Sequence, residues 1–251
     1  MRALALSCWL VGLGTAALGG PGVIQSAEYF EPTERYQHGV FGETSEWGGL
    51  RIWVSDACAG CANANRRHVQ LRLPETHVFE DIAPRVVDLN GDGHPEVVVV
   101  ETNINQGARL AIYDETGLIT ATPYIGRTHR WLAPAGFGDF NNDGQIDLAY
   151  VETPHLGRVL RMFTLQGTAS PQLVEIGRVE GFTNHRIGDP NIWGGVRACN
   201  GTAVLIGANS NWTRMLVGTI SNGVAVITDI GLLESPAQLD AALDCSYPIA
   251  R

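Results

Sequence analysis

Two nine-residue stretches carry the residues best suited to chemistry, and they repeat one acidic pattern. They read Asp88-Leu-Asn90-Gly-Asp92-Gly93-His-Pro-Glu96 and Asp139-Phe-Asn141-Asn-Asp143-Gly144-Gln-Ile-Asp147. Oxygen-bearing side chains occupy positions 1, 3, 5 and 9, and glycine occupies position 6, where the backbone must turn sharply. Hard divalent cations take oxygen ligands from short loops of this kind. The pattern predicts two calcium sites, with the ligands Asp88, Asn90, Asp92 and Glu96 in one and Asp139, Asn141, Asp143 and Asp147 in the other.

The residues that follow each loop exclude a helical EF-hand. An EF-hand loop ends in a bidentate Glu at position 12, whereas position 12 is Val99 in one loop and Tyr150 in the other. The runs 97–100 and 148–151 are typical of buried strands, so we expect each loop to join two strands. Three carboxylates in nine residues repel one another without a cation. An ordinary Asn-Gly or Asn-Asp hairpin turn is the alternative.

Two further segments fit the same spacing but have lost their acids. They read Glu43-Thr-Ser-Glu-Trp-Gly-Gly-Leu-Arg51 and Asp189-Pro-Asn-Ile-Trp-Gly-Gly-Val-Arg197, and the four loops start at residues 43, 88, 139 and 189. Because position 5 is Trp and position 9 is Arg, neither loop should bind calcium. Our hypothesis is that each Arg replaces the cation and bridges back to the carboxylate at position 1, from Arg51 to Glu43 and from Arg197 to Asp189. An ordinary surface hairpin with an unrelated Arg is the alternative.

A period of this size, with short β-rich runs inside each unit, predicts an all-β propeller or solenoid. One unit divides into four strands, at 84–88, 96–101, 106–113 and 118–125. We expect a small β-propeller of about four four-stranded blades, with five as the alternative. The blades are placed near residues 36–80, 82–126, 133–180 and 184–231, and the chain ends close or cap the ring. A short helix is expected only at 235–243, where Ser caps and Pro follows.

The acidic loop followed by an aliphatic strand resembles the FG-GAP or VCBS-type repeat of integrin α-chain propellers and of many secreted bacterial proteins. The resemblance is carried by the loops at 88–96 and 139–147 and covers about half of the mature chain. It implies a calcium-stabilised β-propeller, with the cation in the hairpin between the first two strands of a blade. Such propellers serve adhesion, carbohydrate binding and scaffolding, so the resemblance does not identify a partner.

The N-terminal segment and the composition predict an exported chain that does not bind nucleic acid. Residues 1–27 have one Arg, an apolar stretch and small residues, which predicts a signal peptide cleaved after Gly19 or, as we prefer, near Ala27. The remaining residues 28–251 suit one domain, and no membrane span is expected after cleavage. A net charge of −9 without a basic stripe argues against nucleic acid as a partner. The chain has no Lys, which excludes Schiff-base chemistry and a P-loop.

Four cysteines remain after the signal, an even number that suggests two disulfides in an exported chain. Cys58 and Cys61 are expected to staple a turn-rich loop, and Cys199 then pairs with Cys245. A redox pair would need a helix N-terminus, and zinc would need a second ligand pair. The Lys-free, Arg-rich composition is typical of a GC-rich bacterial genome. We therefore expect a periplasmic or extracellular location.

Histidine and arginine residues that precede the loops are the candidates for a ligand pocket near the propeller axis. Their side chains, beside Trp131, would suit a carboxylate, a sulfate or an acidic sugar. The alternative is that the histidines pack and hydrogen-bond at blade ends. The candidates are His38, Arg85, His129, Arg130, His185 and Arg186.

Two functions remain open from the sequence. The first is a non-catalytic calcium-binding propeller that binds a protein or a glycan. The second is a small hydrolase or lyase acting on an anionic substrate, such as an acidic sugar, in the Arg/His pocket. No Gly-x-Ser-x-Gly or His-Glu-x-x-His motif is present. Glu101 and Glu152 are the only repeated acids outside the loops, and Arg109 and Arg158 are expected to pair with them. We therefore expect no enzymatic activity.

Overall fold

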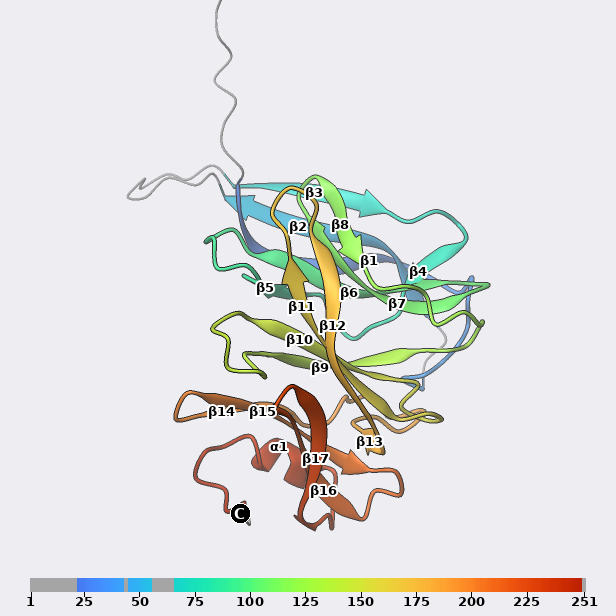
Figure 1. Cartoon of the computed structure of the whole chain (residues 1–251). Helices are drawn as coiled ribbons and strands as arrows, with labels where there is room; N and C mark the ends of the chain where they lie inside the picture. Colours follow the sequence, from blue (N-terminus) through green and yellow to red (C-terminus); the bar gives the residue numbers. More distant parts are fainter. Residues whose placement is uncertain (1–21, 43–44, 56–65, 250–251) are drawn as a thin grey trace, which may run out of the picture.

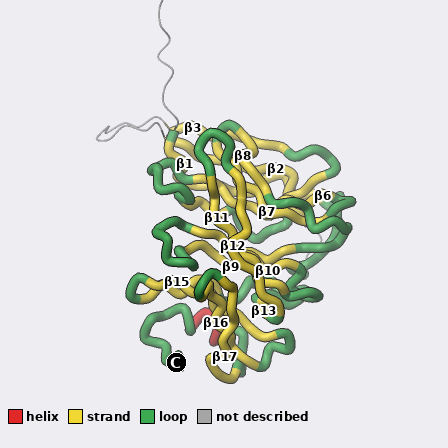
Figure 2. Tube along the Cα trace, in the orientation of Figure 1, coloured by secondary structure: helices red, strands yellow, loops and turns green. Residues whose placement is uncertain are grey.

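The computed structural model describes residues 22–42, 45–55 and 66–249. The described chain is almost entirely β-structure, as the sequence predicts, with one short helix near the C-terminus (Figure 2). Its strands form three antiparallel sheets that follow one another from one end of the molecule to the other (Figure 1). Glu43, Cys58, Cys61 and most of the expected signal peptide lie outside the described residues.

The first sheet has eight strands and contains two units in sequence. β1 (Val23–Thr33), β2 (Glu46–Ser55) and β3 (Arg66–Arg72) pair in that order, and β4 (His77–Phe79) links β2 to β6. The second unit is β5 (Arg85–Val87), β6 (Glu96–Asn103), β7 (Gly107–Asp114) and β8 (Gly117–Ala121). The first acidic loop joins β5 to β6, at the position that the sequence predicts.

The second sheet is one four-stranded unit. It consists of β9 (Leu132–Gly138), β10 (Asp147–Glu152), β11 (Val159–Gln166) and β12 (Gln172–Glu180), each paired with the next. The second acidic loop joins β9 to β10. Both acidic loops therefore occupy the same place in neighbouring units, in the hairpin between the first two strands.

The third sheet contains β13 (Phe182–Thr183), β14 (Gly195–Cys199), β15 (Thr202–Asn209), β16 (Arg214–Ser221) and β17 (Val224–Leu232). Here the predicted alignment of the repeat is wrong. The segment 189–197 does not join the first two strands, because β13 and β14 both pair with β15 and the loop 184–194 lies between them. The hairpin that corresponds to an acidic loop is the tight turn at Asn200 and Gly201, whose φ angles are 53° and 79°.

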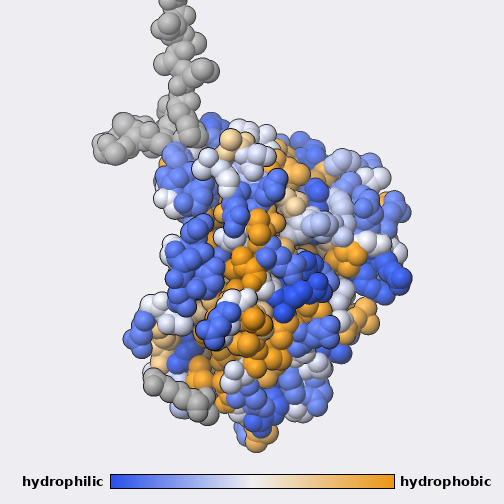
Figure 3. Space-filling view, in the orientation of Figure 1, coloured by the Kyte–Doolittle hydropathy of each residue, from blue (hydrophilic) through white to orange (hydrophobic). Residues whose placement is uncertain are grey.

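Apolar side chains fill the spaces between successive units. One cluster joins Val98, Val100 and Ile112 of the second unit to Leu132 and Tyr150 of the third. Another packs the third unit against the last sheet, and a third packs the first unit against the second. Figure 3 shows apolar side chains gathered on the visible face, in the region where β12 lies beside β17. Each unit is therefore stabilised by burial against its neighbours, at about 25 cal/mol per Å² of apolar surface.

The first and last described strands belong to different sheets. β1 pairs with β2, whereas the segment after β17 covers the last sheet through the helix α1 (Ala237–Ala241) and its buried Leu239. The helix lies inside the range that the sequence predicts. A backbone hydrogen bond of 2.8 Å from Gly188 N to Val40 O connects the loop 184–194 to the segment before β2.

Candidate functional site

The first acidic loop folds around the carboxylate at its first position. Asp88 accepts hydrogen bonds from the backbone N–H groups of Gly91, Asp92 and Gly93, at 2.8, 3.2 and 2.9 Å. Gly91 and Gly93 have φ angles of 73° and 83°, which side-chain-bearing residues rarely adopt. The glycines therefore allow the backbone to curl around the acid. The side chains of Asn90 and Asp92 lie in the same turn, joined by a 3.1 Å hydrogen bond.

The second acidic loop repeats this geometry almost bond for bond. Asp139 accepts from the backbone N–H groups of Asp143 and Gly144 at 3.0 and 2.9 Å, and the amide of Asn141 donates to Asp143 at 2.9 Å. In both loops the acid at position 9 accepts from the N–H of position 2. These bonds are Glu96 to Leu89 N and Asp147 to Phe140 N, each 3.0 Å. The eight residues predicted as ligands therefore lie in two loops of similar backbone geometry, four in each.

The position-9 acids are buried under their loops, which raises their pKa values. Burial, together with the nearby charges of Asp143 and Asp139, raises the pKa of Asp147 to about 6. Burial also raises the pKa of Glu96. The hydroxyl of Thr164, opposite Asp147 on β11, acts in the other direction and lowers this pKa. A buried carboxylate beside two other acids and without a counter-charge is costly, and a cation would remove that cost.

The donor chemistry of both loops fits calcium, which prefers carboxylate and amide oxygens. Among the described residues, no three His, Cys, Asp or Glu side chains already lie together in a metal-ligating group. In each loop the Asn amide nitrogen donates to a neighbouring carboxylate, Asn90 to Asp92 and Asn141 to Asp143. Binding would therefore require these two amides to turn their oxygens toward the cation and the carboxylates to close around it.

The loop at 189–197 corrects our hypothesis of an Arg in place of the cation. The carboxylate of Asp189 accepts from the indole Nε1 of Trp193 at 2.7 Å and from Asn191 N at 3.0 Å. Arg197 instead donates to the carbonyl oxygens of the C-terminal segment, and its residue is only 9% exposed. Those bonds go to Ala242, Cys245 and Tyr247 at 2.8, 3.0 and 3.1 Å.

Arg51 contacts residues of β1, and its pairing with Glu43 stays a prediction. It lies in the middle of β2, and its guanidinium contacts Glu28 on β1 at 2.5 Å and lies over the Phe30 ring. Its expected partner Glu43 lies outside the described residues. The Arg residues of the two altered loops are therefore anchors between neighbouring segments.

Histidines from four separate loops do converge, as the pocket hypothesis requires. His38 stacks on His129 with ring centroids 4.9 Å apart, and a ring nitrogen of His38 contacts Glu80 at 2.5 Å. His155, which we did not single out from the sequence, lies 2.8 Å from His185 through ring nitrogens. Trp131 packs against both His155 and His185.

The arginines predicted for the pocket separate from one another. Arg130 lines the space beside His129, but Arg85 pairs with buried Asp81 at 2.5 Å and Arg186 lies over the Trp212 ring. The cavity beside His38, His129 and His155 has a volume of about 20 Å³, about the space of a single water molecule. Burial lowers the pKa of His155 to about 4 and lowers that of His185 as well.

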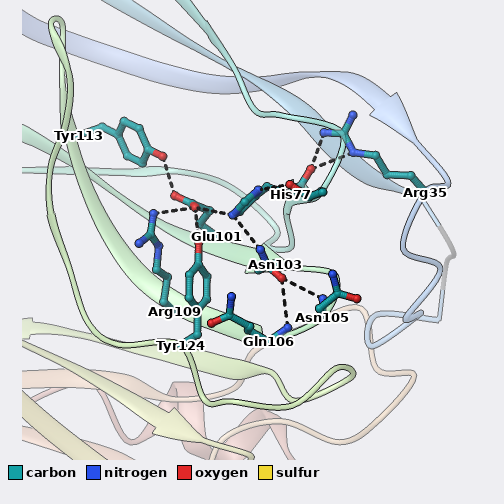
Figure 4. A network of polar contacts seen from close by, with 10 residues as sticks. Arg35, His77, Glu101, Asn103, Asn105, Gln106, Arg109, Tyr113 and Tyr124 are labelled. Atoms are coloured by element: carbon teal, nitrogen blue, oxygen red, sulfur yellow. Dashed lines mark hydrogen bonds and ion pairs between the residues drawn. The ribbon is translucent and has the colours of Figure 1, made fainter.

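Glu101 is the centre of a buried polar network (Figure 4). It accepts hydrogen bonds from Arg109, Tyr113 and Tyr124 at 2.7, 2.6 and 2.8 Å, so its carboxylate is saturated by protein donors. The predicted pairing of Glu101 with Arg109 is confirmed.

The predicted pairing of Glu152 with Arg158 is wrong, because Glu152 pairs with Arg161 at 2.6 Å. Arg158 directly precedes β11 and has a φ angle of 53°. Its guanidinium donates to backbone carbonyls instead.

The predicted disulfide between Cys199 and Cys245 is confirmed, with Cα atoms 5.8 Å apart. It ties the C-terminal segment to β14, beside the carbonyls that Arg197 binds. Such a bond is compatible with an exported protein. No helix among the described residues has the length and apolarity needed to cross a membrane.

Comparison with known proteins finds one family. Residues 88–150 match the model of the FG-GAP-like repeat, a span that begins at the first acidic loop and ends just beyond the second. No curated protein matches the chain significantly. The matched segment contains all eight predicted ligands, so the family comparison and the repeated loop geometry point to the same part of the molecule.

Proposed function

Because the chain carries an FG-GAP-like repeat in an all-β fold, we propose that it is an exported, calcium-binding β-propeller-like module that binds a protein or a glycan and is not an enzyme. Four units form the propeller, and calcium binds in the first hairpin of the second and third. The loops hold the ligands Asp88, Asn90, Asp92 and Glu96, and Asp139, Asn141, Asp143 and Asp147.

One observation carries the calcium proposal. Both loops present a position-9 carboxylate that is buried against two other acids and has no counter-charge among the causes of its raised pKa. In both loops the carboxylates repel one another at close range. One divalent cation per loop would remove this repulsion. Calcium would neutralise the carboxylates and fix each hairpin to the first strands of its unit.

Export is supported by the disulfide. The start of the first strand indicates where the signal peptide would be cleaved. Cleavage after Ala27 would remove the first five residues of β1, including Ile24, which is 3% exposed and pairs with Val54. Cleavage after Gly19 would leave the strand intact. We therefore place the cleavage site at the earlier of the two positions.

The non-catalytic assignment is supported by the surroundings of the candidate groups. The histidine cavity, at about 20 Å³, has no room for a sugar ring, and Arg85 and Arg186 point to other partners. Glu101 is 2% exposed and fully bonded. A glycosidase needs two carboxylates that face one open cleft, and Glu101 is not free for that role.

Thermal unfolding with EDTA and then with calcium tests the proposal. Exported calcium modules bind at about 10⁻⁴ to 10⁻³ M, so about 10 mM calcium should stabilise each site by roughly 1.4–2.7 kcal/mol. We expect the Tm to rise by several degrees per site. An equal Tm in EDTA, calcium and magnesium would refute calcium binding. A glycan array with the calcium-loaded protein then tests the class of partner.

A further inference from the structure

A second cavity shares no residue with the acidic loops, and nothing assigned so far uses it. Its volume is about 450 Å³, within the range of small-ligand sites. It forms where the segments 39–41 and 45–47 and the segment 79–82 meet Pro190 of the loop 184–194. The cavity thus lies where the hydrogen bond between Gly188 and Val40 holds the first and last sheets together.

The walls of this cavity are apolar and largely aromatic. They include Phe41, Trp47, Phe79 and Ile82. Ile82 is 49% exposed, so it stands at the mouth, whereas Phe79 is fully buried behind the wall. Tyr29 stacks against both Trp47 and Phe79, which fixes the positions of those rings.

Three carboxylates also line the cavity, although the walls are apolar. Glu46, Glu80 and Asp81 are 5%, 2% and 4% exposed. Buried acids need compensating charge or hydrogen bonds. Asp81 has both: it pairs with Arg85 and accepts from the N–H of Ile82.

Glu80 has a charged or chargeable partner as well, whereas Glu46 has backbone hydrogen bonds alone. Glu80 contacts a ring nitrogen of His38 and accepts from the Thr102 hydroxyl at 2.7 Å. Glu46 accepts only from the backbone N–H groups of Gln37 and His38, at 3.3 and 2.9 Å. No cationic side chain contacts it among the described residues. Burial, and the charge of Glu80, raise the pKa of Glu46.

The combination selects one class of ligand. An anion would be repelled by the acids, and a neutral apolar ligand would bury Glu46 without a counter-charge. A calcium or magnesium ion requires six or more oxygen ligands or retained water, which aromatic walls do not supply. An alkylated ammonium ion is weakly hydrated, fits aromatic walls and supplies the missing positive charge.

We propose that this cavity binds a ligand with an alkylated ammonium group, with Glu46 as its counter-ion and Trp47 and Phe41 as its aromatic walls. The inference supplies a ligand class for the binding function proposed above. It does not depend on calcium, because the cavity shares no residue with the two acidic loops. Measuring ligand binding in both calcium and EDTA therefore separates failure of this inference from failure of the calcium proposal.

Titration calorimetry with two probes of the same shape provides the test. Choline carries the positive nitrogen, and 3,3-dimethyl-1-butanol replaces that nitrogen by carbon. We expect choline to bind the full chain at least about tenfold more tightly than the neutral alcohol, a difference of about 1.4 kcal/mol. Equal affinities, or no heat from choline at millimolar concentration, would overturn the proposal.

Variants locate the binding site. Glu46→Gln removes the charge with little change in shape and should lower choline affinity about tenfold, while Glu234→Gln, an exposed acid in the C-terminal segment, should not. Ile82→Arg adds a cation at the exposed mouth, so it should fold normally and also abolish choline binding. If Glu46→Gln does not fold, the choline affinity of Ile82→Arg decides whether the cavity is the binding site. Unchanged choline affinity in either folded variant would overturn the proposal.

Discussion

The indole Nε1 of Trp193 donates a hydrogen bond of 2.7 Å to the carboxylate of Asp189. Although burial acts in the opposite direction, this bond and those from Asn191 lower the pKa of Asp189. The loop 184–194 thus closes on its own acid through a neutral donor four residues further along the chain. Arg197, at the end of the segment 189–197, binds the C-terminal segment instead.

Substitution of the indole tests the contribution of this hydrogen bond. Trp193→Phe keeps an aromatic ring but removes the donor, so the free energy of unfolding should fall by about 1–2 kcal/mol, with no dependence on calcium. Urea unfolding in EDTA and in calcium measures both effects. Trp53→Phe, at a 38% exposed position on β2, is the matched control and should lose less. A calcium-dependent loss for Trp193→Phe would contradict the assignment.

Arg197 should be a stability determinant for the C-terminal segment. Arg197→Met leaves three backbone carbonyls without their donor, which is expected to cost about 2–4 kcal/mol. Arg178→Met, at a side chain that is 60% exposed, should change stability by less than about 0.5 kcal/mol. The comparison is made by urea unfolding under oxidising conditions. Equal losses in the two variants would show that the carbonyl contacts contribute nothing.

The disulfide and Arg197 should act on the same segment. A bond between residues 46 apart is expected to contribute about 4 kcal/mol in the chain-entropy account. Because both features tie residues 242–247 to β14, losses in Cys245→Ser and Arg197→Met should not add in the double variant. Full additivity in a double-mutant cycle would mean that the two features stabilise separate parts of the fold.

The acidic loops show which parts of the fold could be predicted from the sequence. Local patterns alone place Asp88 and Asp139 directly after a first strand and place β6 and β10 after the loops. Glycines and acids at fixed spacing define a turn through local backbone conformation and local hydrogen bonds. The valine-rich run 97–100 predicts a strand, and it is buried on both faces.

Contacts between distant segments could not be predicted in this way. The segment at 189–197 resembles the acidic loops in spacing, yet the true hairpin is the Asn200–Gly201 turn, which is itself a strong hairpin signal. The partners of Arg197 lie 45 to 50 residues further along the chain. His155 was missed because it follows its strand, whereas the other candidate histidines precede their loops.

Removing one acid from a calcium loop should have opposite effects with and without the ion. In EDTA, Asp143→Asn relieves repulsion with Asp139 and Asp147, so the variant should be at least as stable as the unmodified chain. In calcium it should lose roughly half of the rise in Tm, because one of two sites is impaired. Asp114→Asn, in a turn without the calcium pattern, is the control. Scanning calorimetry in both buffers measures the shifts, and a full calcium response in Asp143→Asn would contradict the ligand assignment.

The histidine cluster should make the protein less stable in mild acid. Burial, with the nearby charges of His185, His38 and Arg158, lowers the pKa of His155 from 6.5 to about 4. The unfolded chain therefore binds this proton more readily, so the stabilisation is complete above pH 6.5 and is lost as the pH falls toward 4.

Glu46, Glu96 and Asp147 have raised pKa values and act with the opposite sign, so the pH profile of the unmodified protein mixes both contributions. His155→Gln isolates one of them. Its Tm should be lower than that of the unmodified protein at pH 7.5, because the packing against Trp131 is lost, and the gap should shrink or reverse at pH 5, where the variant has no imidazole to protonate. His68→Gln, on the exposed strand β3, should follow the unmodified protein at each pH. A constant gap between pH 7.5 and 5 would mean that protonation of His155 is not linked to unfolding.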